Sequence, residues 1–454
     1  MNKGPVSVDR TSSGKEHFEV LDGLRGSAAF LIVIFHLFNY TFEFRPPFHL
    51  VHHAYLAVDF FFGLSGFVVA HAYDDRWTRM TISQFFGIRL IRLHPLVLIG
   101  ATLGLLGYLL DPFSKGMNHT AAPMLVLAYI TSLLLLPSPP VGGRSGETQA
   151  LNGPAWSLMQ EYLGNIAYAL VLRRLRALTL AIIFGLSGLL LIWAANVKGS
   201  LDGGWGYPEI WMAPLRLTVS FVMGLWLYRV HGRIRLPKIG LLVLSIVLVV
   251  CFQMPQFSKA GDLSLNGLYD AACVLFLFPL IILCGAHSDA GAGMIRLCKL
   301  GGRLSYPLYI THIPFVYVLA CFAWTRHPSM NVKLTWIFIL IPFVIAVAWL
   351  ALNYFDEPRS RLADPPLRHQ ASNRHNDRIG SIVRPKCKSL SQEPKIQLSG
   401  KQLIQERISV DMEFVIFRQD LLRCLKTCSE VRRKVLGDYL LICPCTRRGV
   451  GPPF

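Results

Sequence analysis

Arg25 and His36 lie in one apolar stretch, Leu24–Phe38, that is otherwise typical of a membrane-spanning helix. An ionisable side chain inside a bilayer costs free energy, so it marks a functional site by default. A separation of eleven residues at about 100° each returns to within about 20° of the start, so both side chains share one helix face. They are about 16 Å apart along the helix axis. The spacing therefore predicts a guanidinium near one membrane surface and a proton-transferring imidazole near the bilayer centre.

A carboxylate lies in the next apolar stretch, in the segment VDFFFGLSGF at Val58–Phe67. In an antiparallel pair of helices we expect Asp59 to approach His36, where it would fix the tautomer of the imidazole and raise its basicity. The alternatives are a buried histidine bonded to a backbone carbonyl and an aspartate that caps its helix at the outer surface. Gly63 and Gly66 in the same segment allow close contact between helices.

Two arginines, Arg89 and Arg92, are three residues apart and share a helix face where the third apolar stretch begins. With Arg25 they predict a cluster of three guanidinium groups at the inner membrane surface. Guanidinium groups bind phosphate oxygens in a bidentate manner. The alternative is ordinary anchoring to lipid headgroups.

The segment Pro154–Tyr162 follows a loop rich in proline and glycine and opens the fourth long span. We expect Glu161 to lie about one turn below the outer surface, with Trp156 and Ser157 beside it. The alternatives are an acidic residue favoured by the helix dipole and a tryptophan of the interfacial belt.

Three further polar residues are weaker candidates. His312 lies in a stretch interrupted by Pro307 and Pro314, and its alternative interpretation is a hydrogen-bonded core histidine. His71 and Glu357 complete the set. No pattern of metal ligands is evident among these residues, and we predict no metal site.

The composition predicts an all-α polytopic membrane protein. The chain has 454 residues, a mean hydropathy of +0.43 and only 16% charged residues. We expect no cleavable signal peptide, because the first 20 residues are polar and no small-residue cleavage site follows the first apolar stretch. Of the formal net charge of +18, +8 belongs to residues 363–454. Most of the remainder is expected in cytoplasmic loops, and we predict no nucleic-acid partner.

Eleven apolar stretches are evident, and the one at 123–137 is short for a membrane crossing. Four connectors are rich in arginine and lysine: 76–92, 173–176, 229–238 and 296–303. All four fall on one side only if the 123–137 segment enters the membrane and returns. The positive-inside rule therefore predicts about ten transmembrane helices, a re-entrant segment at 123–137 and both termini in the cytoplasm.

Three parts of the chain are expected. Residues 1–20 form a cytoplasmic N-terminal segment, 21–362 the transmembrane domain, and 363–454 a basic, disordered cytoplasmic tail. The tail has five cysteines but no CxxC pair, so a zinc site is the less favoured alternative. Five other cysteines lie in or beside apolar stretches and are interpreted as small core residues rather than a disulfide framework.

Taken in order, the motifs resemble the membrane-bound acyltransferase-3 family, which includes bacterial O-acyltransferases of O-antigen, exopolysaccharide and Nod factors. The resemblance covers roughly residues 16–362, and the family's ten-helix layout agrees with the charge argument. The segments that carry it are LDGLRG followed by His36, VDFFFGLSGF, the RLIR pair, WSLMQE, SYPLYITH and FDEPRSR.

The resemblance implies a stand-alone, multi-pass enzyme of the bacterial inner membrane that moves an acyl group, by default acetyl, from cytoplasmic acyl-CoA to a hydroxyl of a glycan. Acyl-CoA would be a co-substrate, and no bound cofactor is expected. The separation of Arg25 and His36 is comparable to the length of a pantetheine arm. The implied roles are CoA phosphate binding by Arg25, Arg89 and Arg92, catalysis by His36, Asp59 and Glu161, and acceptor contacts by Trp156 and Ser157.

Two other classes of function use or tolerate similar residues. A transporter of a glycan intermediate or small solute would also place ionisable groups inside the membrane, although we find no two related halves with paired broken helices. A receptor or lipid-anchoring scaffold would not need His36 and Asp59 at depth. The sequence leaves open the acceptor, the acyl group, a covalent acyl-histidine as opposed to direct transfer, and the oligomeric state.

Overall fold

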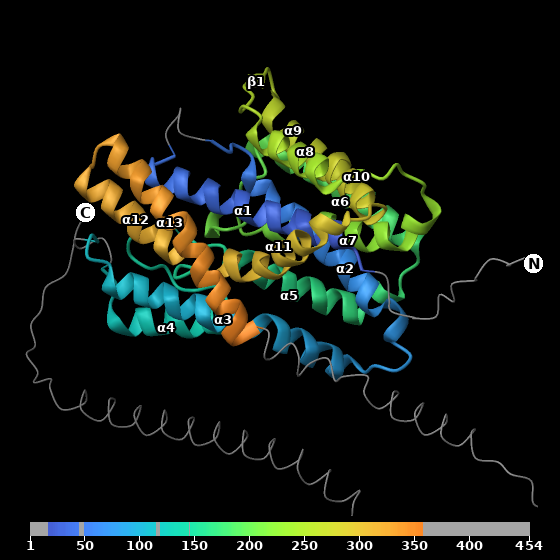
Figure 1. The fold of residues 1–454 in the computed structure, drawn as a ribbon, viewed down its shortest axis with the longest axis horizontal. Helices are drawn as coiled ribbons and strands as arrows, with labels where there is room; N and C mark the ends of the chain where they lie inside the picture. Colours follow the sequence, from blue (N-terminus) through green and yellow to red (C-terminus); the bar gives the residue numbers. More distant parts are fainter. Residues whose placement is uncertain (1–16, 45–49, 115–118, 145, 357–454) are drawn as a thin grey trace, which may run out of the picture. The chain divides into compact units, whose positions relative to one another are not determined.

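The computed structural model describes residues 17–44, 50–114, 119–144 and 146–356. The N-terminal segment before His17, Glu357 and the 363–454 tail therefore lie outside the described residues. Thirteen α-helices and one short hairpin make up this part of the chain (Figure 1). The first seven helices are α1 (Glu19–Thr41), α2 (Ala57–Tyr73), α3 (Ile82–Leu110), α4 (Ala122–Leu133), α5 (Ala155–Leu170), α6 (Ala177–Lys198) and α7 (Met212–Val230).

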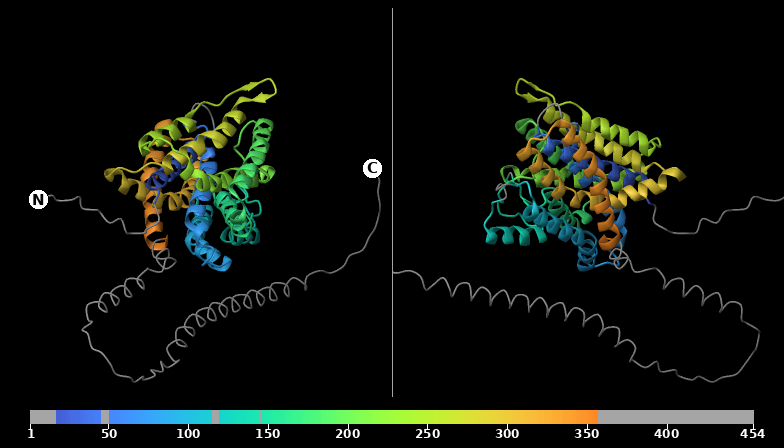
Figure 2. Two further views of the ribbon diagram at one scale, coloured as in Figure 1. Left: turned by 90° about the vertical axis from the view of Figure 1, so that its right-hand side faces the viewer. Right: turned by 60° about the vertical axis from the view of Figure 1, so that its left-hand side comes forward.

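The later helices are shorter and more often interrupted. A π-helix, Cys273–Leu277, connects α9 (Leu265–Ala272) to α10 (Phe278–Ala286). A second π-helix, Leu352–Asp356, follows α13 (Met330–Ala351). The β1–β2 hairpin pairs antiparallel and projects at one edge of the bundle (Figure 2). The remaining elements are α8 (Leu241–Gln253), β1 (Lys259–Ala260), β2 (Leu263–Ser264), α9 (Leu265–Ala272), α10 (Phe278–Ala286), α11 (Ala292–Thr311), α12 (Ile313–Arg326) and α13 (Met330–Ala351).

The predicted all-α membrane architecture is confirmed in its class but not in its number of crossings. Every predicted apolar stretch carries a helix. Within the described ranges, six helical segments are long and apolar enough to cross a membrane, or seven if the bent pair α11–α12 forms one span. Ten crossings are not confirmed: α5 and α8 are shorter than a usual span, and α7 is not among the candidate spans. The 123–137 segment forms the 12-residue helix α4 and stays a predicted re-entrant element.

The segment 296–303 is helical, which corrects its assignment as a connector. It forms the first half of α11, and the chain bends by 48° between α11 and α12. His312 lies at this bend, where it is both the C-cap residue of α11 and the N-cap residue of α12. Pro314 explains the position, because proline has no amide hydrogen to continue the hydrogen bonding of α11.

Two helix pairs form the centre of the bundle, α1 with α11 and α2 with α7. Glycines bring both pairs together. A Cβ on Gly66 would lie 2.1 Å from the carbonyl oxygen of Phe221, and one on Gly26 would lie 2.7 Å from the Cα of Gly301. The predicted close contact along VDFFFGLSGF is therefore confirmed, and α7 is the partner.

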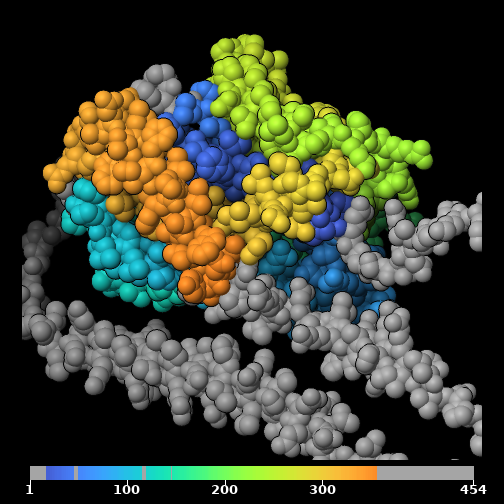
Figure 3. All heavy atoms as spheres, in the orientation of Figure 1, coloured from blue at the N-terminus to red at the C-terminus, as the bar shows by residue number. Residues whose placement is uncertain are grey.

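The outer helices surround this centre. Helices α12 and α13 lie together on one side of α1, and α3 packs against α4 below them in the view of Figure 1. On the face drawn in Figure 3, α1 is visible between the α12–α13 pair and the segment containing α9 and α10. The N-terminal end of α1, the C-terminal end of α2 and the N-terminal half of α3 meet at one end of the bundle, where they line a cavity.

Candidate active site

A cavity of about 840 Å³ opens among α1, α2, α3, α5 and α11. Its lining has an excess of positive charge, because five arginines face two carboxylates, Asp22 and Glu161. Such a lining favours an anionic ligand, since the positive groups concentrate negative charge in a confined space. The arginines are Arg25, Arg76, Arg89, Arg92 and Arg303.

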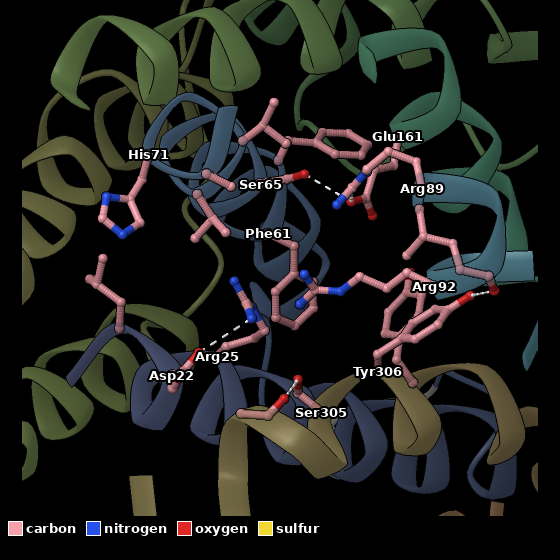
Figure 4. Close-up of a pocket in the computed structure, with 18 of the residues that line it drawn as sticks. Asp22, Arg25, Phe61, Ser65, His71, Arg89, Arg92, Glu161, Ser305 and Tyr306 are labelled. Atoms are coloured by element: carbon pink, nitrogen blue, oxygen red, sulfur yellow. Dashed lines mark hydrogen bonds and ion pairs between the residues drawn. The ribbon is translucent and has the colours of Figure 1, made fainter. Parts of the chain in front are cut away.

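The structure brings together the three arginines singled out from the sequence. Arg25 points into the cavity from the second turn of α1, and Arg89 and Arg92 point into it from α3 (Figure 4). Arg25 has one weak ion pair with Asp22, at 3.4 Å. Arg92 makes no hydrogen bond or ion pair to another described residue and is exposed at the opening.

Arg89 is bound on one side only. Its Nη2 donates to Glu161 Oε1 at 2.9 Å, and Ser65 Oγ donates to the same oxygen at 2.8 Å. The Arg89 side chain is buried, yet its Nε has no hydrogen-bond partner among the described residues. A buried guanidinium with an unused donor is suited to a further anionic oxygen, because charge-assisted hydrogen bonds of this kind are strong.

Glu161 lies on the arginine side of the cavity, which corrects its expected place near the outer surface. The prediction placed it by counting from the start of α5. However, α5 begins inside the bundle, since Ala155 and Trp156 at its first turn are buried. One and a half turns further on, Glu161 therefore meets Arg89 rather than the acceptor side.

Two aromatic rings, Phe61 and Tyr309, also line the cavity, and their ring centroids are 5.7 Å apart. Ser157 lines the cavity too, and its Oγ is 2.8 Å from the hydroxyl of Tyr309. Tyr309 also stands 6.3 Å from His312, measured between ring centroids. Tyr309 is therefore a lining residue of the cavity that also neighbours the histidine pair.

The two candidate histidines form a pair. Nδ1 of His36 lies 2.8 Å from Nε2 of His312, and Nδ1 of His312 lies 2.9 Å from the carbonyl oxygen of Leu308. A carbonyl oxygen only accepts, so Nδ1 of His312 carries a hydrogen. In a neutral pair, Nε2 of His312 is then an acceptor, and His36 donates to it from Nδ1. The remaining nitrogen of His36, Nε2, therefore presents a free lone pair.

The two histidine rings also differ in their accessible surface. His312 is fully buried, whereas His36 keeps some accessible surface although it belongs to the central helix α1. His36 does not line the arginine-rich cavity. The hydrogen bond from His36 to His312 therefore orients His36, and of the two rings only His36 keeps accessible surface.

Asp59 does not orient His36, which corrects the sequence prediction. Both of its carboxylate oxygens accept hydrogen bonds from Arg216 of α7, the shortest at 2.6 Å. Arg216 also donates to the carbonyl oxygens of Gly203 and Tyr55. The prediction failed because α7 packs against α2 and offers a guanidinium to Asp59. A guanidinium attracts a buried carboxylate more strongly than a neutral imidazole does.

The remaining candidates lie in distinct places. Trp156 is buried, and its ring faces the guanidinium of Arg216 at 5.4 Å. It does not line the cavity, whereas His71 does. Glu357 is outside the described residues. No group of three or more histidine, cysteine or acidic residues in the described ranges forms a metal site.

Sequence reasoning missed four residues of this region: Arg216, Tyr309, Tyr40 and Glu147. Arg216 interrupts an apolar stretch in the same way as Arg25, so the cost of a buried charge would have identified it. The other three carry no comparable signal, because tyrosines are common near membrane surfaces and Glu147 lies in a polar loop.

Comparisons with known proteins show the family of the chain. The Acyl_transf_3 family model, described as an acyltransferase domain, matches residues 18–353. A curated relative, "Protein 2 in picA locus" of Rhizobium radiobacter, is 37% identical over 175 residues, which is 35% of this chain and 84% of the relative. No solved structure matches. The family match spans every helix that lines the cavity, and the chain belongs to the acyltransferase-3 family of multi-pass membrane proteins.

Proposed function

We propose that the protein is an integral-membrane O-acyltransferase that moves an acyl group, by default acetyl, from cytoplasmic acyl-CoA to a hydroxyl of a carbohydrate. The observation that carries this proposal is the histidine pair, in which His312 leaves Nε2 of His36 free as a base. A positioned histidine base contributes typically about 10²–10⁴-fold to the rate of such a reaction.

The donor side rests on the arginine-lined cavity. Coenzyme A ends in phosphate groups, and Arg25, Arg89 and Arg92 offer guanidinium groups to them. The apolar side chains of the lining suit the pantetheine arm. Tyr309 lines this cavity and neighbours His312, so the thioester would pass Tyr309 on its way to His36.

The chemistry is a transfer in which one bond forms and one breaks. Nε2 of His36 takes the proton of the acceptor hydroxyl as its oxygen attacks the thioester carbonyl. The C–O bond forms, the C–S bond breaks, and the departing CoA sulfur takes up the proton from His36. In the covalent form of the reaction, Nε2 attacks the thioester carbonyl and CoA leaves as the thiolate. The acceptor oxygen then displaces the imidazole from the acyl group, and its proton goes to the CoA thiolate.

The test is acyl transfer by purified protein in lipid nanodiscs. We measure CoA release from acetyl-CoA in the presence of the deacylated surface glycan that a gene-deletion strain of the source organism makes. His36→Ala should lower the rate by at least 10²-fold. Exposed His327→Asn is the matched control, since asparagine tolerates the left-handed backbone there. Full activity in a folded His36→Ala variant, or net movement of glycan without CoA release, would overturn the proposal in favour of a transporter or another site.

A further inference from the structure

A second polar cluster lies next to the histidine pair, on the side away from the arginine-lined cavity. Tyr40 follows His36 by one turn of α1, and the two ring centroids are 6.0 Å apart. The hydroxyl of Tyr40 donates to Glu147 Oε1 at 3.2 Å, and the hydroxyl of Tyr317 donates to Oε2 at 2.6 Å. The guanidinium of Arg144 covers the Tyr317 ring at 3.9 Å. None of these residues lines the arginine-rich cavity.

We propose that Tyr40, held by Glu147, belongs to the acceptor subsite and binds a second hydroxyl of the acceptor beside the one that His36 deprotonates. The proposal rests on the proposed function, because it assigns the neighbour of the same base. It assigns the acceptor to molecules with at least two hydroxyls close together, which monosaccharide units provide.

The hydrogen bond to Glu147 fixes the direction of the Tyr40 hydroxyl. The Tyr40 hydroxyl hydrogen points to Glu147, so its oxygen is left with lone pairs that can only accept. Nε2 of His36 also only accepts. Two acceptors on one helix face, one turn apart, suit a ligand that donates twice, and a polyol does so with neighbouring hydroxyls.

The residues of this cluster differ in their accessible surface. Tyr40 and His36 both keep accessible surface, whereas Glu147 and Tyr317 are buried behind them. The ligand therefore meets the first two residues, and the second two fix the rotor of Tyr40. A hydroxyl whose direction is fixed before binding loses less entropy when the ligand arrives.

The loop that carries Glu147 is itself held in place. Ser138 N donates to the carbonyl of Thr148 at 2.8 Å, and Thr148 N donates to that of Trp205 at 2.9 Å. Gln149 Nε2 donates to the carbonyl of Leu136 at 2.9 Å. Burial raises the pKa of the Glu147 carboxyl above its usual range, so the fold maintains an unfavourable group at this position. Such a supported and costly side chain is typical of a functional site.

The test separates KM for the acceptor from KM for the donor, with the same deacylated glycan and acetyl-CoA in nanodiscs. Tyr40→Phe removes only the hydroxyl and should raise the acceptor KM roughly threefold to tenfold, as for one lost hydrogen bond, with the acetyl-CoA KM unchanged. Glu147→Gln should act in the same direction, because the amide holds the rotor less firmly. Tyr317→Phe breaks an equivalent bond to Glu147 away from His36 and should change the acceptor KM less.

Three outcomes overturn the inference alone: an unchanged acceptor KM in Tyr40→Phe, equal effects of Tyr40→Phe and Tyr317→Phe, or equal rises in the KM of both substrates. The last two would indicate a structural cluster. Loss of folded Tyr40→Phe protein is tested with Tyr40→Trp, which fills the site but offers no acceptor oxygen and should raise the acceptor KM similarly. If His36→Ala keeps full activity, the proposed function itself has failed, and that result is independent of the tyrosine variants.

Discussion

Among the arginine–carboxylate pairs that connect helices in the described residues, Arg216–Asp59 and Arg89–Glu161 differ in how completely their atoms are bonded. Arg216 and Asp59 are 1% and 0% exposed, and every nitrogen of the guanidinium has a partner. Arg89 and Glu161 are 7% and 21% exposed, share one hydrogen bond and border the cavity. The first pair leaves nothing for a ligand to bind. The second keeps an unused donor beside the cavity, so the same chemistry fills every donor in one place and leaves one available to an anionic ligand in the other.

The largest effect is expected from breaking Arg216–Asp59, the closed pair, whose guanidinium has no unused nitrogen. Arg216→Met leaves the Asp59 carboxylate buried without a partner, which costs about 3–5 kcal/mol and should abolish most folded protein. The measurement is the yield of monodisperse protein after detergent extraction, together with its Tm. The double variant Asp59→Leu/Arg216→Met removes both charges and should recover part of the yield. A well-folded Arg216→Met protein that has lost only acyl transfer would instead place this pair in the catalytic machinery.

A smaller effect, on substrate binding rather than on folding, is expected at Arg89–Glu161, the open pair, in which Arg89 keeps an unused donor. Arg89→Gln should raise the acetyl-CoA KM by roughly 10- to 100-fold, the equivalent of about 1.4–3 kcal/mol for a charge-assisted hydrogen bond. The Tm should stay near that of the parent, because Glu161 is partly exposed and can be hydrated. Steady-state kinetics at saturating acceptor give the measurement.

Arg174→Gln is the matched control, since Arg174 is an exposed arginine that does not line the cavity. An unchanged donor KM in Arg89→Gln would remove Arg89 from the donor site. A fall in Tm as large as that of Arg216→Met would erase the distinction between the two pairs.

The difference between the pairs also explains what could be predicted from the sequence. The cluster of Arg25, Arg89 and Arg92 could be predicted because each lies at the start of an apolar stretch, and periodicity puts Arg89 and Arg92 on one helix face. The helices themselves were predictable for the same reason. The face that a residue takes within its own helix depends mainly on local pattern.

Partners across the bundle were less predictable. Asp59 was assigned to His36, yet Arg216 of α7, 157 residues away in sequence, bonds it. The partner of His36 is likewise distant, since His312 lies 276 residues further along the chain. Which of several buried polar groups pair is decided by helix packing, here by the glycine contact of α2 with α7, and no local pattern contains that information.

The smallest predicted effect concerns how the open pair is held. Ser65 donates to the Glu161 oxygen that also binds Arg89, so it shares in fixing the direction of that guanidinium. Ser65→Ala should raise the acetyl-CoA KM by about threefold with little change in Tm, because one neutral donor to a carboxylate is lost where water can replace it. Ser65→Thr keeps the hydroxyl and should stay within about twofold of the parent. If alanine and threonine act alike, the space at this position matters rather than the bond. Glu161 would then be a counter-ion of Arg89 that needs no support, and the open pair would be simpler than its geometry indicates.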